Sequence, residues 1–408
     1  MHDSVSERGR SVHPALFFVL YFSFGASGGF LTGAAENTYV AGGVSTAAFG
    51  AVLGVSLAPQ VAKVLWAPLV DTLLTPKLWY VAATVAVAAA IVAAGLLPVR
   101  AASLPALSAI SIVVAVGASF LGMAADSLMA HDTAPGQRGA AGGWSQAGNL
   151  GGSGIGTSAS LAIAGVTHSL PLAGLGVAGL CAACCLALIF APRSHSLPRQ
   201  PSYLETLKLV VKDCWEVIRA RLGWLTLFLF VLPLGAGAAA NLLTGIAHEW
   251  RVGPGLLAAI ALAGAIATGV GSIVGGYICD RMDRRAAYVL FGVLAGATAA
   301  MAALAPKTPV WFVAFGVSYN AALGMAYAAY AAANLEAIGR GAAATKYTLF
   351  ASVANIPVAL MPLADGWADT RHGADAMLWL EFGVALAAAA LYFAVALATR
   401  PRRALAPA

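Results

Sequence analysis

Apolar stretches of similar length, separated by short polar turns, follow one another along nearly the whole chain. Each stretch matches the roughly 20 mainly apolar residues that a helix needs to cross the hydrocarbon core of a membrane. Uninterrupted apolar runs do not suit the alternating strands of a membrane barrel, so the spans are expected to be helical. The pattern predicts twelve membrane-spanning helices, at residues 15–35, 46–70, 78–98, 104–130, 139–165, 171–191, 223–246, 253–279, 286–304, 310–335, 344–364 and 377–399.

One polar segment is much longer than the others and divides the chain. Residues 192–222 form a charged break between six predicted helices in residues 1–191 and six in residues 223–408. Within the break, apolar residues recur at helical spacing from Leu204 to Ile218, and Lys and Arg occupy much of the remaining surface. We interpret the break as a cytoplasmic linker with a basic amphipathic helix on the anionic inner leaflet. A plain tether between the two helical groups is also compatible with it.

The composition excludes a soluble globule. The chain has 408 residues, of which 60% are hydrophobic and only 10% are charged, and its mean hydropathy is +0.82. Globular chains are about 45–50% apolar and about 25% charged, so this chain cannot cover itself with polar surface in water. The predicted fold class is therefore an all-α membrane protein, with twelve helices in two six-helix bundles.

The distribution of Lys and Arg predicts the orientation in the membrane. With the N-terminus inside, the cytoplasmic segments hold seventeen of the 23 basic residues and the outside loops hold four. Basic residues concentrate in cytoplasmic loops of membrane proteins, so the net charge of +6 requires no nucleic-acid partner. We expect a multi-pass protein of the bacterial inner (cytoplasmic) membrane with both termini cytoplasmic. The first apolar run lacks a convincing cleavage site and is interpreted as a retained helix.

The residues give no sign of enzymatic or metal chemistry. Four of the five cysteines lie in apolar runs, where thiols behave as small hydrophobic side chains. The chain contains no Walker loop and no His-Glu-x-x-His motif. We therefore expect no enzymatic activity, no metal and no cofactor. An ion gradient is then the plausible source of energy.

Short internal repeats support two related halves. The sequence Arg-Gly-Ala-Ala at Arg138–Ala141 recurs at Arg340–Ala343, 202 residues later, where the eleventh predicted helix begins. Asp71, after the second helix, corresponds to Asp280, after the eighth, at an offset of 209 residues. Two parallel halves of six helices are typical of two-bundle secondary transporters.

The strongest general motif is Gly275–Arg285, which reads Gly-Gly-Tyr-Ile-Cys-Asp-Arg-Met-Asp-Arg-Arg. It resembles the loop signature of the major facilitator superfamily, in which a small-residue helix end is followed by Asp-Arg and a basic pair. Glycines let neighbouring helices approach closely, and the resemblance implies that the charged groups hold one conformation of a gate. The positive-inside rule alone would also explain the arginines. The predicted gating residues are Asp71, Asp280, Arg281, Arg284 and Arg285.

Three other segments carry a narrower resemblance: Pro59–Asp71, which contains Lys63 and a Trp-Ala-Pro-Leu-x-Asp run, Ala125–Asp132, and Ala344–Ser352. They resemble the group of this superfamily that includes the AmpG muropeptide permeases, the acetyl-CoA transporters and the RhtX/FptX siderophore permeases. The resemblance implies import of a polar metabolite by alternating access. The chain departs from the group's pattern at Lys346, where Gln is usual, and near His131, where Arg is frequent. These departures leave the substrate open.

Ionisable side chains inside predicted helices are the first candidates for the transport site. Each costs roughly 2.5–3.5 kcal/mol at a helix centre, so such groups usually pair or face a cavity. Lys63 and Asp126 have similar predicted depths, and we hypothesise that they face one another and couple transport to protons. Lys63 would equally fit a lysine that extends to the inner surface. Glu36 and Lys346, nearer helix ends, are further candidates, with solvation at the surface as the alternative.

Uncharged polar side chains complete the candidate site. Asn320, Tyr327 and Asn334 follow one another by seven residues, which places them on one helical face. By analogy with the superfamily, the first, fourth, seventh and tenth helices line the cavity, although such side chains also serve as contacts between helices. The predicted substrate and proton pathway consists of Glu36, Gln60, Lys63, Ser119, Asp126, Asn241, Asn320, Tyr327, Tyr330, Asn334, Lys346 and Tyr347.

These observations predict a proton-coupled secondary transporter that imports a polar metabolite such as a muropeptide or a siderophore. The expected partners are a small-molecule substrate, protons and the lipid bilayer, with no nucleic acid, and the protein is expected to be a monomer. Two alternatives remain open at this point. One is an efflux permease for amphipathic compounds, and the other is a non-transporting membrane sensor on the same fold.

Overall fold

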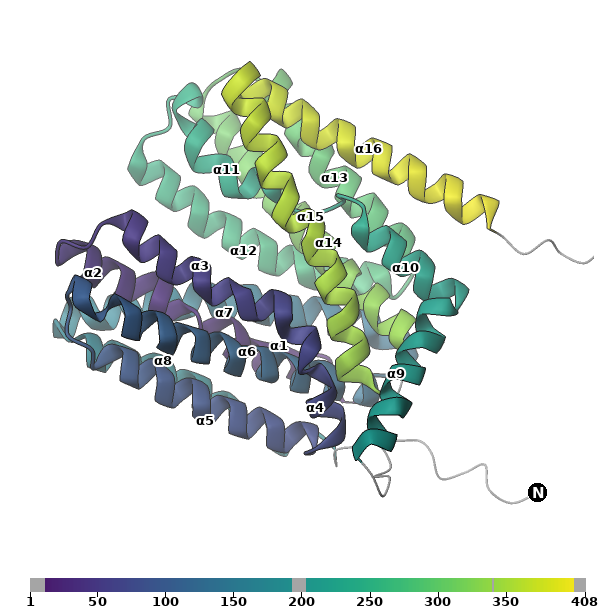
Figure 1. The fold of residues 1–408 in the computed structure, drawn as a ribbon. Helices are drawn as coiled ribbons and strands as arrows, with labels where there is room; N and C mark the ends of the chain where they lie inside the picture. Colours follow the sequence, from purple (N-terminus) through teal and green to yellow (C-terminus); the bar gives the residue numbers. More distant parts are fainter. Residues whose placement is uncertain (1–11, 193–202, 340, 400–408) are drawn as a thin grey trace, which may run out of the picture.

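The computed structural model describes residues 12–192, 203–339 and 341–399, and every regular element in these ranges is a helix. Helices α1–α8 form the first bundle and α10–α16 the second, while α9 lies between them in the sequence (Figure 1). The elements of the first bundle are α1 (Leu16–Ala26), a π-helical turn (Leu31–Ala35), α2 (Glu36–Ala41), α3 (Thr46–Ala62), a 3₁₀ turn (Lys63–Leu65), α4 (Ala67–Thr72), α5 (Pro76–Gly95), a 3₁₀ turn (Ala101–Ser103), α6 (Leu104–Asp132), a 3₁₀ turn (Pro135–Gln137), α7 (Arg138–Thr167), α8 (Leu170–Ala183) and a 3₁₀ turn (Cys184–Ile189).

The second half of the chain begins with the helix of the linker. Its elements are α9 (Tyr203–Arg219), α10 (Arg221–Val231), α11 (Ala238–Ile246), a 3₁₀ turn (Ala247–Trp250), α12 (Pro254–Cys279), α13 (Arg284–Leu304), α14 (Pro309–Ile338), α15 (Ala343–His372) and α16 (Ala374–Ala398). The helix α9 covers most of the amphipathic segment that the sequence predicts within the linker. The linker residues 193–202 lie outside the described part of the chain.

Ten helical segments within the described residues are long and apolar enough to cross a membrane. The two other predicted spans differ from them for identifiable reasons. The helix α7 is rich in Gly and Ser and packs among α1, α12 and α14, so its surface meets other helices more than lipid. The seventh span is broken into α10 and α11, and Gly235 and Gly237 in the break have φ values of +61° and +70°, which glycine adopts without steric cost.

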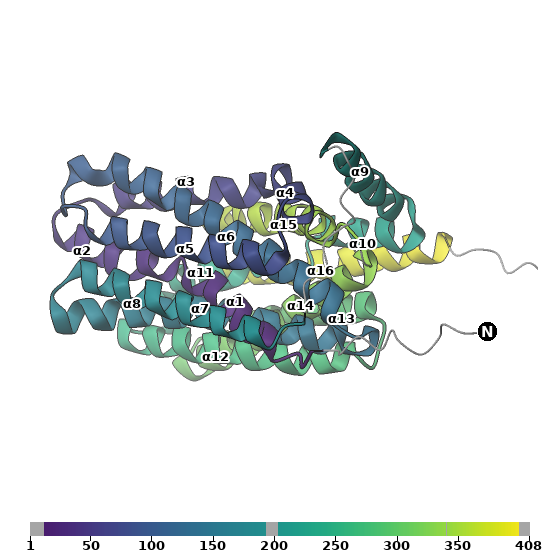
Figure 2. The ribbon, with the colours of Figure 1, turned by 90° about the horizontal axis from the view of Figure 1, so that it is seen from below.

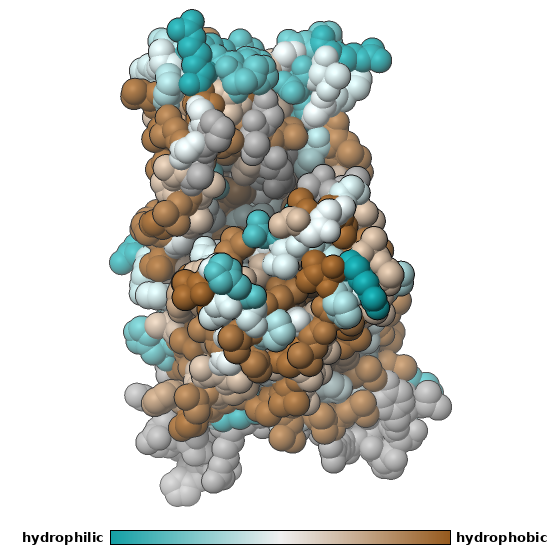
Figure 3. Space-filling model, turned by 90° about the vertical axis from the view of Figure 1, so that its left-hand side faces the viewer, coloured by the Kyte–Doolittle hydropathy of each residue, from teal (hydrophilic) through white to brown (hydrophobic). Residues whose placement is uncertain are grey.

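The molecule has two distinct ends. Residue 12, the helix α9 and the last turn of α16 lie at one end, called here the α9 end (Figures 1 and 2). The helix α2 and the turn between α15 and α16 lie at the opposite end. Seen from that opposite end, the surface is hollowed between its upper and lower parts, and apolar residues cover much of it (Figure 3). Large apolar side chains such as Leu262 and Leu363 are 65% and 70% exposed, as expected for helices that face lipid.

Glycines set the closest helix contact of the first bundle, between α1 and α7. A Cβ atom at Gly148 would lie 2.2 Å from the backbone oxygen of Phe18, and one at Gly152 would lie 2.3 Å from that of Phe22. Both distances are shorter than any van der Waals contact, so only glycine permits this separation of the two backbones. Close approach of two backbones is the usual role of glycine at helix contacts in membrane proteins.

Replacing Gly152 by Ala is therefore expected to lower the thermal unfolding midpoint of the purified protein in detergent. The new methyl group would force α1 and α7 apart, at a cost of about 1–3 kcal/mol. Gly154 lies on the same helix, but a Cβ atom there would meet no atom within 4 Å. Gly154→Ala is thus the matched control and should leave the midpoint unchanged or raise it. Equal midpoints for the two variants would contradict the packing argument.

Candidate functional site

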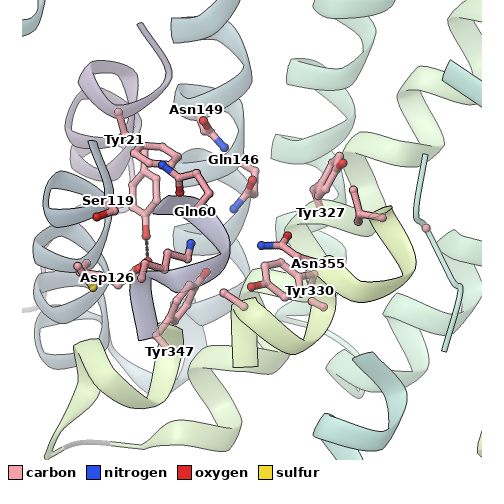
Figure 4. A pocket seen from close by; sticks show the side chains of 18 of the residues that line it. Tyr21, Gln60, Ser119, Asp126, Gln146, Asn149, Tyr327, Tyr330, Tyr347 and Asn355 are labelled. Atoms are coloured by element: carbon pink, nitrogen blue, oxygen red, sulfur yellow. Dashed lines mark hydrogen bonds between the residues drawn. The ribbon is translucent and has the colours of Figure 1, made fainter. Parts of the chain in front are cut away.

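A cavity of about 340 Å³ lies between the two bundles. Its walls come from α1, α3, α6 and α7 on one side and from α13, α14 and α15 on the other. Figure 4 shows Tyr327, Tyr330 and Asn355 of the second bundle across the cavity from side chains of the first. Its polar lining consists of Tyr21, Gln60, Lys63, Ser119, Asp126, Gln146, Asn149, Tyr288, Tyr327, Tyr330, Tyr347 and Asn355.

A break in the second span places Lys63 in this cavity. The helix α3 ends at Ala62, and Pro68, which has no N–H group, begins the next helix after a 3₁₀ turn at Lys63–Leu65. The break is anchored on α6, because the indole Nε1 of Trp66 donates a hydrogen bond of 2.9 Å to the Ser119 hydroxyl. One turn earlier, the Gln60 amide donates to the carbonyl oxygen of Ala115 over 3.2 Å. Pro68 and Trp66 thus fix the break in the helix, and the break places the Lys63 ammonium group at the cavity.

Asp126 has a different partner from the one that the sequence predicts. The hydroxyl of Tyr21, on α1, donates a hydrogen bond to Asp126 Oδ1 (Figure 4). Lys63 and Asp126 line the same cavity and their charges interact, but they form no ion pair within 4.0 Å. The predicted direct pair is therefore replaced by a tyrosine–carboxylate contact. This arrangement leaves the Lys63 ammonium available to a ligand.

Seven of the twelve predicted pathway residues line the cavity, and four others lie elsewhere. Asn320 accepts a hydrogen bond of 3.2 Å from Thr268 of α12, and buried Asn334 donates 3.3 Å to the backbone oxygen of Tyr347. The residues 320 and 334 are roughly 21 Å apart along α14, so the cavity reaches only the middle of the stripe. Glu36 lies at the opposite end of the molecule, as the first residue of α2. The side chain of Asn241 lies outside the described part of the structure.

The sequence-based argument did not identify five polar residues of the lining. Gln146 and Asn149 lie in the glycine-rich helix α7, which the sequence suggests only as a packing element. Tyr21, Tyr288 and Asn355 are single polar groups in apolar stretches of their helices. Their convergence depends on how the two bundles dock. The one available signal was the clustering of Gln and Asn in a helix otherwise made of small residues.

At the α9 end, two aspartates join the bundles in the same way. Asp280, after α12, accepts hydrogen bonds from the backbone N–H groups of Gly139 (2.7 Å) and Ala140 (2.9 Å) at the start of α7. Asp71, in α4, accepts bonds from the N–H groups of Ala344 (3.2 Å) and Thr345 (2.8 Å) at the start of α15. A carboxylate there satisfies donors that have no partner within the helix and also meets the positive end of its dipole.

These two contacts explain both internal repeats. Asp280 caps the start of α7, which begins with the Arg-Gly-Ala-Ala sequence, and Asp71 caps the start of α15, which begins at the last Ala of the repeated sequence. The missing side chain of Gly139 is required, because a Cβ atom there would lie 2.7 Å from Asp280 Oδ1 and 2.3 Å from the backbone oxygen of Gly276. The two bundles are thus held together at the α9 end by a pair of reciprocal helix caps.

The three predicted gating arginines have different surroundings. Arg284 forms an ion pair of 3.0 Å with Glu336 of α14, lies 3.7 Å from Asp280, and donates to the backbone oxygen of Pro135 in the first bundle. Arg285 pairs with Asp283 within its own bundle, at 2.7 Å. Arg281 is exposed and donates to the backbone oxygen of Tyr277, also within its own bundle. Of the three, Arg284 makes the described contact between bundles.

Lys346 is not part of the cavity, which corrects its assignment to the pathway. The side chain is 1% exposed, and its ammonium group forms an ion pair of 3.0 Å with Asp213 of α9. The same Asp213 carboxylate accepts a hydrogen bond of 2.8 Å from the N–H of Ala342, just before α15. The linker helix is therefore attached to α15 one turn from the Asp71 cap. A lysine at this position reaches the linker and not the substrate.

Asp71 gives the closed α9 end a dependence on pH. Burial raises the pKa of Asp71 to about 6, against the hydrogen bonds from Thr345 and Ala344 and the charge of Lys346. In a conformation with the α9 end open, the solvated carboxyl would titrate near its ordinary value of about 4. The closed conformation therefore binds this proton more tightly than the open one. Lowering the pH through 6 favours closure, and raising it removes that contribution.

Acidification from pH 7.5 to pH 5 is expected to raise the ratio of closed to open molecules roughly tenfold, because the proton affinities differ by about two pH units. The distance between spin labels at Gln137 and Met282, which lie on different bundles at the α9 end, would report this ratio. The labelled chain would carry serines in place of its own cysteines. Asp71→Asn removes the titrating group and should flatten the response. A pH response that survives in Asp71→Asn would assign it to another group.

Known proteins share this arrangement. Residues 225–408 match the family model of the Major Facilitator Superfamily. The human organic anion transporter MFSD10 (TETRAN) superposes with a TM-score of 0.69 at 16% identity, over 95% of this chain and 100% of its own. The transporter FucP in its outward conformation superposes with a TM-score of 0.67 at 16% identity. The match covers 94% of this chain and 99% of FucP. The proton:xylose symporter XylE, bound to 6-bromo-6-deoxy-D-glucose, superposes with a TM-score of 0.62 at 13% identity. The match covers 93% of this chain and 94% of XylE. A search of curated proteins found no match to this sequence.

The comparisons confirm the predicted fold class: the chain has the all-helical major facilitator fold. The structures named above belong to transporters. At identities of 13–16% they show the fold alone. The narrower resemblance to the muropeptide, acetyl-CoA and siderophore group therefore stays a prediction.

Proposed function

We propose that this protein is a secondary transporter that works by alternating access, and that the structure is its outward-facing conformation. The observation that carries this proposal is the cavity between the bundles together with the reciprocal caps that join the bundles at one end. A cavity walled by both bundles changes its exposure when the bundles rock against each other, so one site can serve both sides of the membrane. The likeness to FucP in its outward conformation supports the assignment of state.

The α9 end is the cytoplasmic end in this proposal. Most of the described Lys and Arg residues lie in the segments at that end, as the positive-inside rule requires. The basic helix α9 exposes Val211 and Trp215 (61% and 55%), which suits a helix that rests on an anionic membrane surface. The protein then lies in a bacterial inner membrane as a monomer, with both termini cytoplasmic.

The cavity chemistry favours a polar, anionic metabolite. Five tyrosines and four amide side chains line the cavity, so aromatic faces and hydrogen-bonding groups surround a ligand on all sides. Lys63 is the one cationic residue among the described lining residues and would bind an anionic group of the substrate. Muropeptides and siderophores of the resembled group meet this description, and an organic anion is also the substrate class named for MFSD10. Tyr21 and Asp126 would take up and release the coupling proton during import.

A thermal-shift screen of the purified protein against muropeptides, siderophores and acyl-CoA compounds tests the substrate class. A ligand that binds only the folded protein raises the unfolding midpoint. At a ligand concentration one hundred times the dissociation constant, the folded protein is stabilised by about 2.7 kcal/mol. Stabilisation by an anionic compound in wild type but not in Lys63→Gln is the expected result. A silent screen would count against these three substrate classes.

Transport in proteoliposomes would then separate the proposed function from its alternatives. Substrate-driven alkalinisation of the outside medium indicates proton-coupled import. Substrate uptake driven by an outward-directed proton flow would instead indicate an efflux permease that runs in exchange with protons. Binding without any flux would favour a membrane sensor.

A further inference from the structure

Two buried carboxyl groups lie apart from the central cavity, inside the second bundle. Asp365 belongs to α15 and is 0% exposed, and Glu381 belongs to α16 and is 8% exposed. Both lie in the half of their helices nearer the opposite end of the molecule (Figure 1). Neither residue lines the cavity that contains Lys63 and Asp126.

The two carboxyl groups differ sharply in their partners. Glu381 Oε1 accepts a hydrogen bond of 2.8 Å from the N–H of Ala239, at the start of α11, and one of 2.9 Å from the Tyr319 hydroxyl. Asp365 has no donor on either of its oxygens among the described residues. The helices α15 and α16 pack together, and the carboxyl of Glu381 is the charged group that acts on Asp365. A fully buried carboxylate without any donor is among the costliest groups in a membrane protein.

The charged surroundings offer no compensation. No Lys, Arg or His of the described residues forms an ion pair within 4.0 Å with either carboxyl. Tyr319 is the ionisable side chain that faces the pair from α14, α11 contains no ionisable residue, and α13 contributes Gly296 to the contact with α16. Further along α15 and α16, Asp369 lies near Arg371 and His372, and Asp375 is paired with Lys307, so these charges are already balanced locally. Two ionised carboxylates in contact would repel each other strongly here.

We propose that Asp365 and Glu381 share one proton and form a proton-binding site separate from Tyr21 and Asp126. A proton on one carboxyl removes the repulsion and supplies the hydrogen-bond donor that Asp365 lacks. The pair titrates as a unit, in the manner of carboxyl dyads in general. No bond other than the O–H bond forms or breaks, and the proton is exchanged with water.

The position of the pair connects this proton to the central cavity. Ala239, which donates to Glu381, is at the start of α11, just after the break in the seventh span. Gly235 in that break lines the cavity. When the shared proton leaves, repulsion between the carboxylates displaces Glu381 from the start of α11, and the break allows α11 to move. This coupling rests on the proposed transport function, whereas the shared proton does not.

Infrared difference spectroscopy of the purified protein in lipid tests the shared proton without any substrate. The expected result is a carbonyl band of a protonated carboxyl at neutral pH, which shifts in heavy water and disappears on alkaline titration. Asp365→Asn should remove this band, because the remaining Glu381 carboxylate then has donors from Ala239, Tyr319 and the new amide. Glu381→Gln should shift the frequency of the band and the pH at which it disappears, because buried Asp365 then keeps a proton without its carboxyl partner. Asp369→Asn, one turn further along α15, is the matched control and should leave the band unchanged. Two variants keep the test valid if one of them fails to fold.

The opposing outcomes are equally distinct. A band that stays unchanged in either folded variant would overturn the proposal, because the proton would then belong to another carboxyl. A band that appears only when sodium is removed would show that the pair binds a metal cation in place of the proton, which also overturns it. Either result would leave the proposed transport function untouched, since that function is tested by flux.

Discussion

Asp126→Asn is expected to abolish proton-driven accumulation of substrate and to leave substrate exchange intact. In the proposed mechanism the Asp126 carboxyl, held by the Tyr21 hydroxyl, is the group that gains and loses the coupling proton in the cavity. Asn keeps the size and a hydrogen-bond acceptor for Tyr21 but cannot change its charge. Accumulation should therefore fall to the equilibrium level in proteoliposomes with an imposed proton gradient, whereas exchange of labelled for unlabelled substrate should continue, because exchange moves no net proton.

Glu36→Gln is the matched control for this experiment. Glu36 is also an acidic residue in the first bundle, but it lies at the opposite end and outside the cavity. It should therefore accumulate substrate like wild type. Wild-type accumulation by Asp126→Asn would remove Asp126 from the coupling mechanism. In that case the carboxyl pair of Asp365 and Glu381 would be the remaining candidate for the coupling proton.

Lys63→Gln separates a binding role from a lysine that merely extends to the membrane surface. The structure places Lys63 in the cavity without an ion pair to Asp126, so its charge is available to an anionic substrate. Loss of a charge-assisted contact costs about 1.5–3 kcal/mol, or roughly tenfold to hundredfold in affinity. An isothermal titration with an anionic ligand from the screen measures this change. Unchanged affinity and transport would support the surface position that the sequence left open.

The sequence predicted the helices well because hydropathy reports directly on the solvent of each segment. The eleventh helix shows where this signal fails. Its predicted apolar run ends at residue 364, but the helix continues past Pro362 to His372. Proline is tolerated inside membrane helices, where neighbouring helices can satisfy the freed backbone group. The early end left Asp365 in a predicted loop, so its burial against Glu381 could not be foreseen.

Local motifs correctly indicated the positions of residues that depend on their own helix. They did not indicate the contacts of residues whose partners are set by the docking of the bundles. Asp71, Asp280 and Lys63 owe their positions to helix ends and to a proline-induced break, and all of these have local sequence signals. Lys346 has the same local signature as a cavity lysine, yet the linker helix provides its partner. The linker's position relative to α15 is a long-range property. Periodicity therefore gave the face of a helix but not the neighbour that the face would meet.

The gate at the α9 end provides the second large effect. Asp280→Asn is expected to shift the population toward the conformation with the α9 end open, because Gly139 and Ala140 lose a charged acceptor. Each hydrogen bond to a charged group contributes about 1.5–3 kcal/mol, so loss of one cap should change the ratio of open to closed molecules roughly tenfold to hundredfold. Asp71→Asn, at the other cap, carries no charge, like the protonated carboxyl that favours the closed α9 end. It should therefore not add to the opening in the double variant.

The distance between spin labels at Gln137 and Met282 measures this shift, with the chain's own cysteines replaced by serine. Asp283→Asn is the matched control, because Asp283 lies in the same loop and caps a helix too, but its acceptor contacts are with Arg285 and Ala286 of its own bundle. It should leave the distance between the bundles unchanged. If Asp280→Asn behaves like this control, the arginines and aspartates of the loop have only an orienting role in the membrane. If Asp280→Asn alone opens the α9 end fully, one cap dominates and the symmetry of the repeats is structural only.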